Sequence, residues 1–325
     1  METAIIILVV ILIIFLILML AGNFFFSFAL NTESLFSMQK IMPILLKKNG
    51  TNVQEYSGYT GSKEEKDWFS KIRKNVYINS KDGLKLHGYE IINENGNGNY
   101  IIACHGYSGS ANDMARYAKW YYSMGYSLII PDARAHGTSE GHVRGMGWLE
   151  RLDIPIWINK ILSEHEDAKI ALFGISMGAA TVMMTSGEEL PKQVCAVIED
   201  CGYSSAWDEF EKQLKNMFHL PSFPLMNVAS IVTKIRGGYS LKEASAVNQL
   251  KKCKLPVLFI HGKDDQFVPF EMLDIVYDAA TTEKEKLAVE NAGHAMSSTK
   301  EPEIYWNTVK AFLNKHMNKI VTDNK

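Results

Sequence analysis

The sequence predicts an α/β fold in which a mostly parallel central sheet is covered by helices on both faces. From residue 76 onward, short apolar segments of strand length alternate with longer segments of helical periodicity. Near-continuous apolar strands in such an alternation are typical of a parallel sheet with both faces buried. The chain of 325 residues is long enough to bury this core without disulfides or metals. An uninterrupted apolar run, residues 4–21, precedes this body.

The apolar run predicts a transmembrane helix, and we assign residues 1–30 to an N-terminal anchor. A helix of about 20 residues spans the roughly 30 Å of bilayer hydrocarbon. A cleaved signal peptide is the main alternative, but it needs a basic start, a shorter run and a small-x-small cleavage site. Here Glu2 is the only charge before the run, and Met19 stands where a small residue is expected. A buried helix is a third alternative.

The charges flanking this segment indicate an orientation. No Lys or Arg precedes it, whereas Lys40, Lys47 and Lys48 follow it. The positive-inside tendency therefore favours a single-pass protein of the cell membrane whose body lies on the cytoplasmic face. Four Cys without a disulfide-like spacing agree with a reducing compartment.

The remaining chain divides into a connector and a body. Residues 31–75 are expected to connect the membrane to the body, with an amphipathic helix over 63–74. The body, residues 76–325, opens with strands at 76–78 and 84–92 around the tight turn Lys81-Asp82-Gly83. Further strands are predicted at 100–104, 127–131, 169–173, 194–198, 257–260 and 286–290. Helices are predicted at 111–124 and 147–163, from Met177, from about Pro269, and at 301–317.

One stretch, about residues 203–255, breaks the alternation and lacks a strand. We interpret it as a helical cap insertion over the carboxyl ends of the strands, where open α/β sheets bind their ligands. Its aromatic and Met residues fit an apolar substrate pocket, and they fit simple packing of the insertion onto the core equally well.

Composition excludes several functions. Lys plus Arg is 34 and Asp plus Glu is 36, so the formal charge of −2 argues against nucleic-acid binding. The sequence contains no His-Glu-x-x-His motif and no Walker loop. No metal or cofactor is therefore expected.

A candidate nucleophile lies in Gly174-Ile175-Ser176-Met177-Gly178, between a predicted strand and a predicted helix. A sharp strand-to-helix turn would expose the Ser176 hydroxyl, and small flanking residues would keep the crowded backbone free of collisions. A chance occurrence of this pattern in a tight turn is the alternative.

A serine nucleophile needs a base, and the base needs an acid. His294 follows the last predicted strand and is the candidate base. Asp265 is the preferred acid, because it precedes Val268-Pro269 at the turn into the next helix; Asp264 and Asp200 remain alternatives.

Acyl transfer also needs donors for the oxyanion. We expect one from the backbone N–H of Met177, and we nominate the N–H of Tyr107 in His105-Gly106-Tyr107-Ser108-Gly109 as the second. The His105 side chain is expected to be structural, and His87 has a polar, solvated setting.

With these motifs the body resembles the α/β-hydrolase superfamily across roughly residues 76–317, in the chain order nucleophile, acid, histidine. Residues 132–139 look like the family segment D-x-R-G-H-G-x-S, with Ala135 in place of a Gly. The resemblance implies that Asp132 and His136 shape a turn and are not a second catalytic pair. The layout is similar to bacterial membrane-anchored hydrolases of the prolyl-oligopeptidase-like and serine-aminopeptidase-like branch.

These residues together predict an α/β-hydrolase fold and a membrane-anchored serine hydrolase that cleaves a small carboxylic ester through an acyl-enzyme. A serine peptidase is the first alternative, and Glu209 or Glu211 would then have to hold a substrate amine. A non-catalytic binding protein is less consistent, because every expected catalytic position is present.

Overall fold

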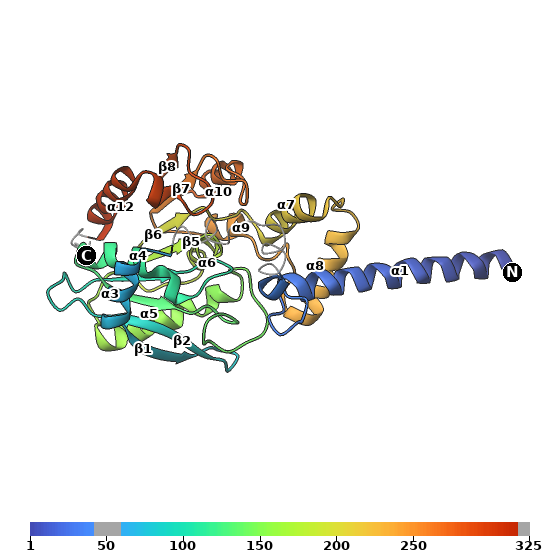
Figure 1. The fold of residues 1–325 in the computed structure, drawn as a ribbon, viewed down its shortest axis with the longest axis horizontal. Helices are drawn as coiled ribbons and strands as arrows, with labels where there is room; N and C mark the ends of the chain where they lie inside the picture. The colour runs from blue at the N-terminus through green and yellow to red at the C-terminus, as the bar shows by residue number, and fades with distance from the viewer. Residues whose placement is uncertain (42–59, 318–325) are drawn as a thin grey trace, which may run out of the picture.

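The computed structural model describes residues 1–41 and 60–317. The described residues form one mixed sheet with helices on both faces and a long N-terminal helix that projects from one end (Figure 1). Two lysines of the orientation argument, Lys47 and Lys48, lie outside the described residues.

The sheet has eight strands in the order β1-β2-β4-β3-β5-β6-β7-β8. The pairs β1–β2 and β2–β4 are antiparallel, and all other neighbours are parallel, which confirms the expected hairpin followed by a parallel sheet. The strands are β1 (Lys74–Asn79), β2 (Lys85–Ile91), β3 (Tyr100–Cys104), β4 (Ser127–Pro131), β5 (Ile170–Ile175), β6 (Val194–Asp200), β7 (Val257–Gly262) and β8 (Lys284–Val289).

Helices cover both faces of this sheet. Side chains of α3, α4 and α12 pack on one face, and those of α5, α6 and α10 pack on the other. The helical elements are α1 (Glu2–Ala29), α3 (Lys63–Ile72), η2 (Ala111–Met114), α4 (Ala115–Ser123), η3 (Glu150–Leu152), α5 (Ile154–Glu164), α6 (Met177–Thr185), α7 (Ala206–Phe218), α8 (Leu225–Gly237), α9 (Ala246–Leu250), α10 (Glu271–Ala279), α11 (Ser297–Lys300) and α12 (Pro302–Met317).

Burial explains why the central strands are apolar without alternation. Every residue of β3, β4, β5 and β7 is buried, because helices cover these strands on both sides. The hairpin strand β1 alternates between half-buried and exposed residues, as expected for an edge strand. The central strands carry their loops to one edge of the sheet, where the site is built.

Helix α1 is the one described helix that is long and apolar enough to cross a membrane. Its last turns are not free, however, because they pack against α8 of the insertion (Figure 1). At Gly22 an added Cβ would lie 2.8 Å from Val228 Cγ1, so the two backbones approach closely. Arg236 of α8 also donates a hydrogen bond to Asn23 Oδ1 at 2.6 Å. The separate anchor over residues 1–30 and the connector over 31–75 stay predictions.

The segment between β6 and β7 is helical, as the sequence predicted. It contains α7, α8 and α9, and its side chains complete the larger hydrophobic cluster on the α5–α6 face. Ser205 caps α7 by accepting a hydrogen bond from the Asp208 N–H at 3.0 Å.

We expect Phe173→Ala to lower the free energy of unfolding by about 3–5 kcal/mol, because it leaves a cavity in the closed core. Phe173 is fully buried, and its ring lies 4.9 Å from that of Tyr117 and 5.3 Å from that of Tyr121. Urea unfolding of the full chain in detergent measures the change. Ile304→Ala, at a 53% exposed position, is the control and should change stability by less than about 0.5 kcal/mol.

Candidate active site

Ser176 lies on the sharp turn between β5 and α6. Its backbone adopts φ 56° and ψ −118°, a region that non-glycine residues rarely occupy. The Ser176 N–H donates to the Asp200 carbonyl at 2.8 Å, which ties the turn to the neighbouring strand β6. The side chain is 8% exposed, so its hydroxyl reaches the edge of a site that is otherwise buried.

The two glycines around Ser176 are required by space. A Cβ at Gly174 would lie 2.1 Å from the Gly178 carbonyl oxygen. A Cβ at Gly178 would lie 2.1 Å from the Cys104 carbonyl oxygen on β3. Because real Cβ atoms do not approach backbone this closely, only glycine lets strand, turn and helix pack here. The spacing of the two glycines around Ser176 in the sequence therefore reflects the close packing of strand, turn and helix.

The structure brings the three sequence-predicted side chains together. His294 Nε2 lies 2.9 Å from Ser176 Oγ, and His294 Nδ1 lies 2.7 Å from Asp265 Oδ2. His294 follows β8 and Asp265 follows β7, so both reach Ser176 from loops at one edge of the sheet. With Nδ1 donating to the carboxylate, Nε2 is left as an acceptor for the serine proton.

The two alternative acids do not contact this histidine. Asp264 is exposed to solvent, and its N–H donates to the Ala292 carbonyl at 3.0 Å. Asp200 is fully buried and accepts a hydrogen bond from the Tyr305 hydroxyl at 2.9 Å. The geometry therefore favours Asp265 among the three candidates.

The Asp265 carboxylate is buried, yet its surroundings keep it ionised. One oxygen, Oδ1, accepts the N–H groups of Phe267 and Val268, each at 2.9 Å. Burial raises the pKa of Asp265, but hydrogen bonds from His261 and His294 outweigh it and lower the pKa to about 2. His261, to which sequence reasoning gave no role, lies with Nε2 3.3 Å from Asp265 Oδ2. The acid is therefore ionised throughout the physiological range.

Two backbone amides at this edge are available as donors. Met177 is the first residue of α6, so its N–H has no acceptor within the helix. Across residues 1–41 and 60–317, neither the Met177 N–H nor the Tyr107 N–H donates to a protein acceptor. Both nominated backbone N–H groups are therefore free to donate a hydrogen bond to a ligand.

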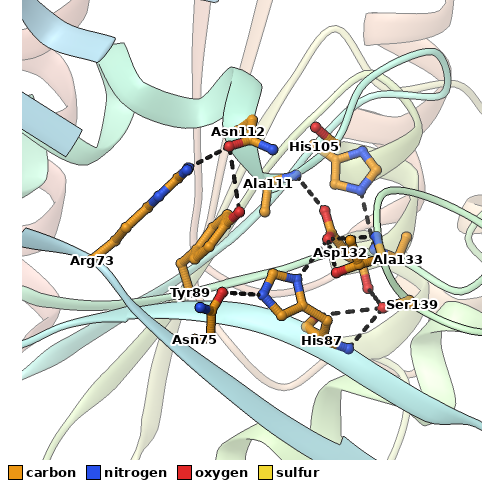
Figure 2. A network of polar contacts seen from close by, with 12 residues as sticks. Arg73, Asn75, His87, Tyr89, His105, Ala111, Asn112, Asp132, Ala133 and Ser139 are labelled. Carbon is orange, nitrogen blue, oxygen red and sulfur yellow. Dashed lines mark hydrogen bonds and ion pairs between the residues drawn. The ribbon is translucent and has the colours of Figure 1, made fainter. Parts of the chain in front are cut away.

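A network around Asp132 shapes the loop that carries Tyr107 (Figure 2). Asp132 accepts the Ala111 N–H at 2.7 Å and contacts His87 Nδ1 at 2.7 Å. His105 Nε2 accepts the Ala133 N–H at 3.1 Å, which confirms a structural role for that side chain. The expectation of a solvated His87 is wrong, because Asp132 and Asn75 satisfy both of its ring nitrogens in a buried place that the polar sequence around it did not reveal.

A large apolar pocket adjoins the site. It lies between α1, α7 and α8 and is partly open to solvent. Tyr107 and Phe267 also line it, and the Phe267 ring lies 5.0 Å from the His294 ring. Phe267 is therefore shared by the pocket wall and the surroundings of His294, whereas Ser176, Met177 and His294 are not among the described residues that line the pocket. From α1, the wall includes Phe25, Phe26, Phe28, Ala29 and Leu30.

Glu209 is the one acidic residue among the described residues that line this pocket. It is 3% exposed; Gln213 donates to its Oε1 at 2.9 Å, and its Oε2 has no partner among the described residues. Burial raises the pKa of Glu209 to about 8, so the side chain is mostly neutral at pH 7. The rest of the pocket wall is mostly apolar, with Gln213 and Thr233 as further polar residues.

The same edge holds the one described cluster of potential metal ligands. Ligand atoms of Cys201, Asp265 and His294 lie within 4.8 Å of one another. Burial raises the pKa of the Cys201 thiol well above its usual range, so it stays protonated and is a weak ligand. The other two groups already hydrogen-bond each other, so this donor set fits a proton relay better than a metal.

Comparison with known proteins agrees with this fold. The family model described as "Serine aminopeptidase, S33" matches residues 97–218. Protein YqkD of Bacillus subtilis (strain 168) is 32% identical over 251 residues, which are 75% of this chain and 81% of YqkD. A thermostable monoacylglycerol lipase of Bacillus sp. (strain H-257) is 22% identical and covers 60% of this chain and 82% of the lipase.

A solved structure of another protein has a similar fold. The Pyrococcus furiosus esterase Pf2001 superposes with a TM-score of 0.63 at 24% identity, covering 79% of this chain and 97% of the esterase. The fold and the site's architecture define an α/β hydrolase. The chain belongs to the α/β-hydrolase superfamily and to the same family as YqkD, and it is a hydrolase.

Sequence reasoning missed the contribution of α1 to the pocket. A signal was present, because Asn23 and Ser27 interrupt the apolar run four residues apart and therefore lie on one helix face. Both accept hydrogen bonds from Arg236, at 2.6 and 3.3 Å. This polar pair marks the point where α1 meets α8.

We expect the free energy of unfolding to fall less between pH 5 and pH 9 in the Glu209→Gln variant than in the unaltered chain. A carboxyl whose pKa is raised on folding stabilises the fold fully below its unfolded pKa, and this contribution is lost as pH rises through the folded pKa of about 8. The neutral amide does not titrate, so the difference in unfolding free energy should reach roughly 2–5 kcal/mol at the alkaline end. Thermal unfolding across this range measures it.

Glu211→Gln provides the control for this measurement, because Glu211 lies on the same helix and does not line the pocket. Parallel stability curves for Glu209→Gln and the unaltered chain would contradict the raised pKa.

Proposed function

We propose that the protein is a serine hydrolase that cleaves carboxylic esters through an acyl-enzyme intermediate. The observation that carries the proposal is the continuous chain from Ser176 through His294 to Asp265, with contacts of 2.9 and 2.7 Å. This chain begins at a serine on a strained turn and lies beside an apolar pocket.

In the proposed acylation, Ser176 Oγ attacks the ester carbonyl carbon while His294 Nε2 takes the hydroxyl proton. The carbonyl oxygen becomes an oxyanion, which the Tyr107 and Met177 amides stabilise by donating hydrogen bonds. The C–O bond to the leaving group then breaks, and His294 returns the proton to the departing alkoxide. The Asp265 charge stabilises the intermediate imidazolium.

Deacylation repeats these steps with water as nucleophile. His294 removes a proton from water, the hydroxide adds to the acyl carbon, and the bond to Ser176 Oγ breaks. The proton returns to the serine, and a carboxylic acid leaves. No cofactor enters the cycle, since each residue supplies or accepts a proton within hydrogen-bonding reach.

The residues of the pocket favour an ester substrate over a peptide that is bound by its amino terminus. An aminopeptidase needs a negative charge to hold the substrate ammonium, and Glu209 is the acidic side chain that the described pocket offers. Because burial raises the pKa of Glu209 to about 8, it supplies little charge at pH 7. A higher kcat/KM on aminoacyl-nitroanilides than on matched esters would instead favour a peptidase.

We further propose that α1 is an uncleaved single-pass anchor with the hydrolase body on the cytoplasmic face. The hydropathy of α1 and the lysines after it support this arrangement. In intact cells, a membrane-impermeant thiol reagent should leave a cysteine introduced at Lys63 unlabelled and label one introduced at Glu2. Labelling at Lys63 would place the body outside.

Asp265→Asn should lower kcat on p-nitrophenyl butyrate by about 10³–10⁴-fold with little change in KM, because the amide no longer stabilises the imidazolium or holds its tautomer. Ser176→Ala should remove both turnover and labelling by a fluorophosphonate probe. Steady-state kinetics and gel-based labelling of the full chain in detergent measure both effects.

Asp264→Asn is the matched control, because Asp264 is the exposed neighbour of Asp265. Its kcat should stay within about twofold of the unaltered chain. Equal losses in the two Asn variants, or labelling that persists in Ser176→Ala, would contradict the assigned roles.

A further inference from the structure

The free part of α1 is long enough to span a bilayer without the part that packs on the body. Residues 2–17 are all exposed, and burial begins only near Gly22. At 1.5 Å per residue, the segment from Glu2 to Leu20 rises about 28 Å, close to the thickness of the hydrocarbon core. The turns of α1 that pack on α8 therefore lie at the membrane surface.

The helical insertion is fixed to α1 at this level. Gly22 allows the backbone of Val228 to approach closely, and Arg236 donates hydrogen bonds to Asn23 and Ser27. Because both contacts involve α8, this helix must lie beside the point where α1 enters the bilayer. In Figure 1, α8 and the connection from α7 lie at the end of the body from which α1 projects.

The insertion presents large apolar side chains on its solvent-exposed surface. On α8, Ile231 is 53% exposed and Ile235, one turn later, is 72% exposed. In the connection from α7, Leu220 is 40% exposed and Phe223 is 78% exposed. Four large apolar residues on one short insertion, next to a membrane helix, form the kind of patch that marks a membrane contact. We call these four residues the insertion patch.

The pocket is walled in part by α7 and by α8, the helix that carries Ile231 and Ile235. Phe25 and Phe28 of α1, Met217 and Phe218 of α7, and Leu225 and Met226 of α8 all line it. The wall also includes Tyr107 and Phe267, and the Phe267 ring lies 5.0 Å from the ring of the proposed base. A largely apolar pocket with a wall from α1, and with another wall residue, Phe267, that also lies against the proposed base, suits an acyl chain whose ester carbonyl lies at Ser176.

We propose that the substrate is a long-chain acyl ester of the membrane, and that its acyl chain passes from the bilayer across the insertion patch into the pocket between α1, α7 and α8. This inference rests on the proposed function and names its substrate class. The insertion patch is occupied by the bilayer surface, because it is continuous with α1 where that helix leaves the membrane. A short, water-soluble ester reaches Ser176 without using either feature.

The test compares two substrates with full-length protein reconstituted into phosphatidylcholine vesicles. One is 1-palmitoylglycerol within the same vesicles, and the other is soluble p-nitrophenyl butyrate. The double variant Ile231→Glu/Ile235→Glu should lower the rate on the palmitoyl ester about tenfold and leave the butyrate rate within twofold. Met217→Trp, which fills the pocket, should lower the ratio of palmitoyl to butyrate kcat/KM by at least tenfold.

The matched control is Ile304→Glu on α12, which places the same charge at a 53% exposed position away from α1. It should change neither rate.

Equal effects of the patch variant on both substrates, or none on either, would overturn the inference. So would conversion of a dimer to a monomer by the patch variant, since that result assigns the patch to a second copy. The proposed function fails separately, if the unaltered chain hydrolyses no butyrate ester.

Discussion

The positive-φ turn at Ser176 is the constraint on which the site depends. Holding a non-glycine residue at φ 56° and ψ −118° costs on the order of 1–3 kcal/mol, so the surroundings must impose it. Gly174 and Gly178 do so by letting β5, α6 and β3 pack to distances that no Cβ would allow. Since every residue of α6 is buried, the helix cannot shift to relieve the strain. The hydroxyl is therefore fixed before any substrate arrives.

The geometry favours Asp265, which follows β7, over Asp200, the candidate acid at the end of the nearer strand β6. Asp200 closes β6 next to Ser176, but its carbonyl accepts the Ser176 N–H and its carboxyl group accepts from the Tyr305 hydroxyl. Burial raises the pKa of Asp200 to about 6, whereas Asp265 has two backbone donors and a pKa lowered to about 2. Of the two, Asp265 is the carboxylate that hydrogen-bonds His294, and its pKa is lowered and not raised.

The sequence alone was sufficient to predict the structure where local patterns determine it. The apolar runs predicted the strands, and the residues around Ser176 predicted the turn, because strand period and glycine spacing are local properties. It was insufficient where distant segments meet. The polar surroundings of His87 suggested exposure, yet packing between β2 and the Asp132 turn buries it. Likewise, nothing local to Phe26 predicts that it meets Arg236, whose guanidinium lies 4.4 Å from its ring centre.

The contact between α1 and the insertion makes the N-terminal helix part of the folded body. The Tyr107 hydroxyl donates to the Ala29 carbonyl, and the Arg144 N–H donates to the Leu30 carbonyl at 3.0 Å. A chain cut at residue 31 would lose these contacts together with Phe25 and the other α1 residues of the pocket wall. It would expose the apolar sides of α7 and α8, so the N-terminal helix stabilises the apolar pocket as well as supplying the segment suited to cross the bilayer.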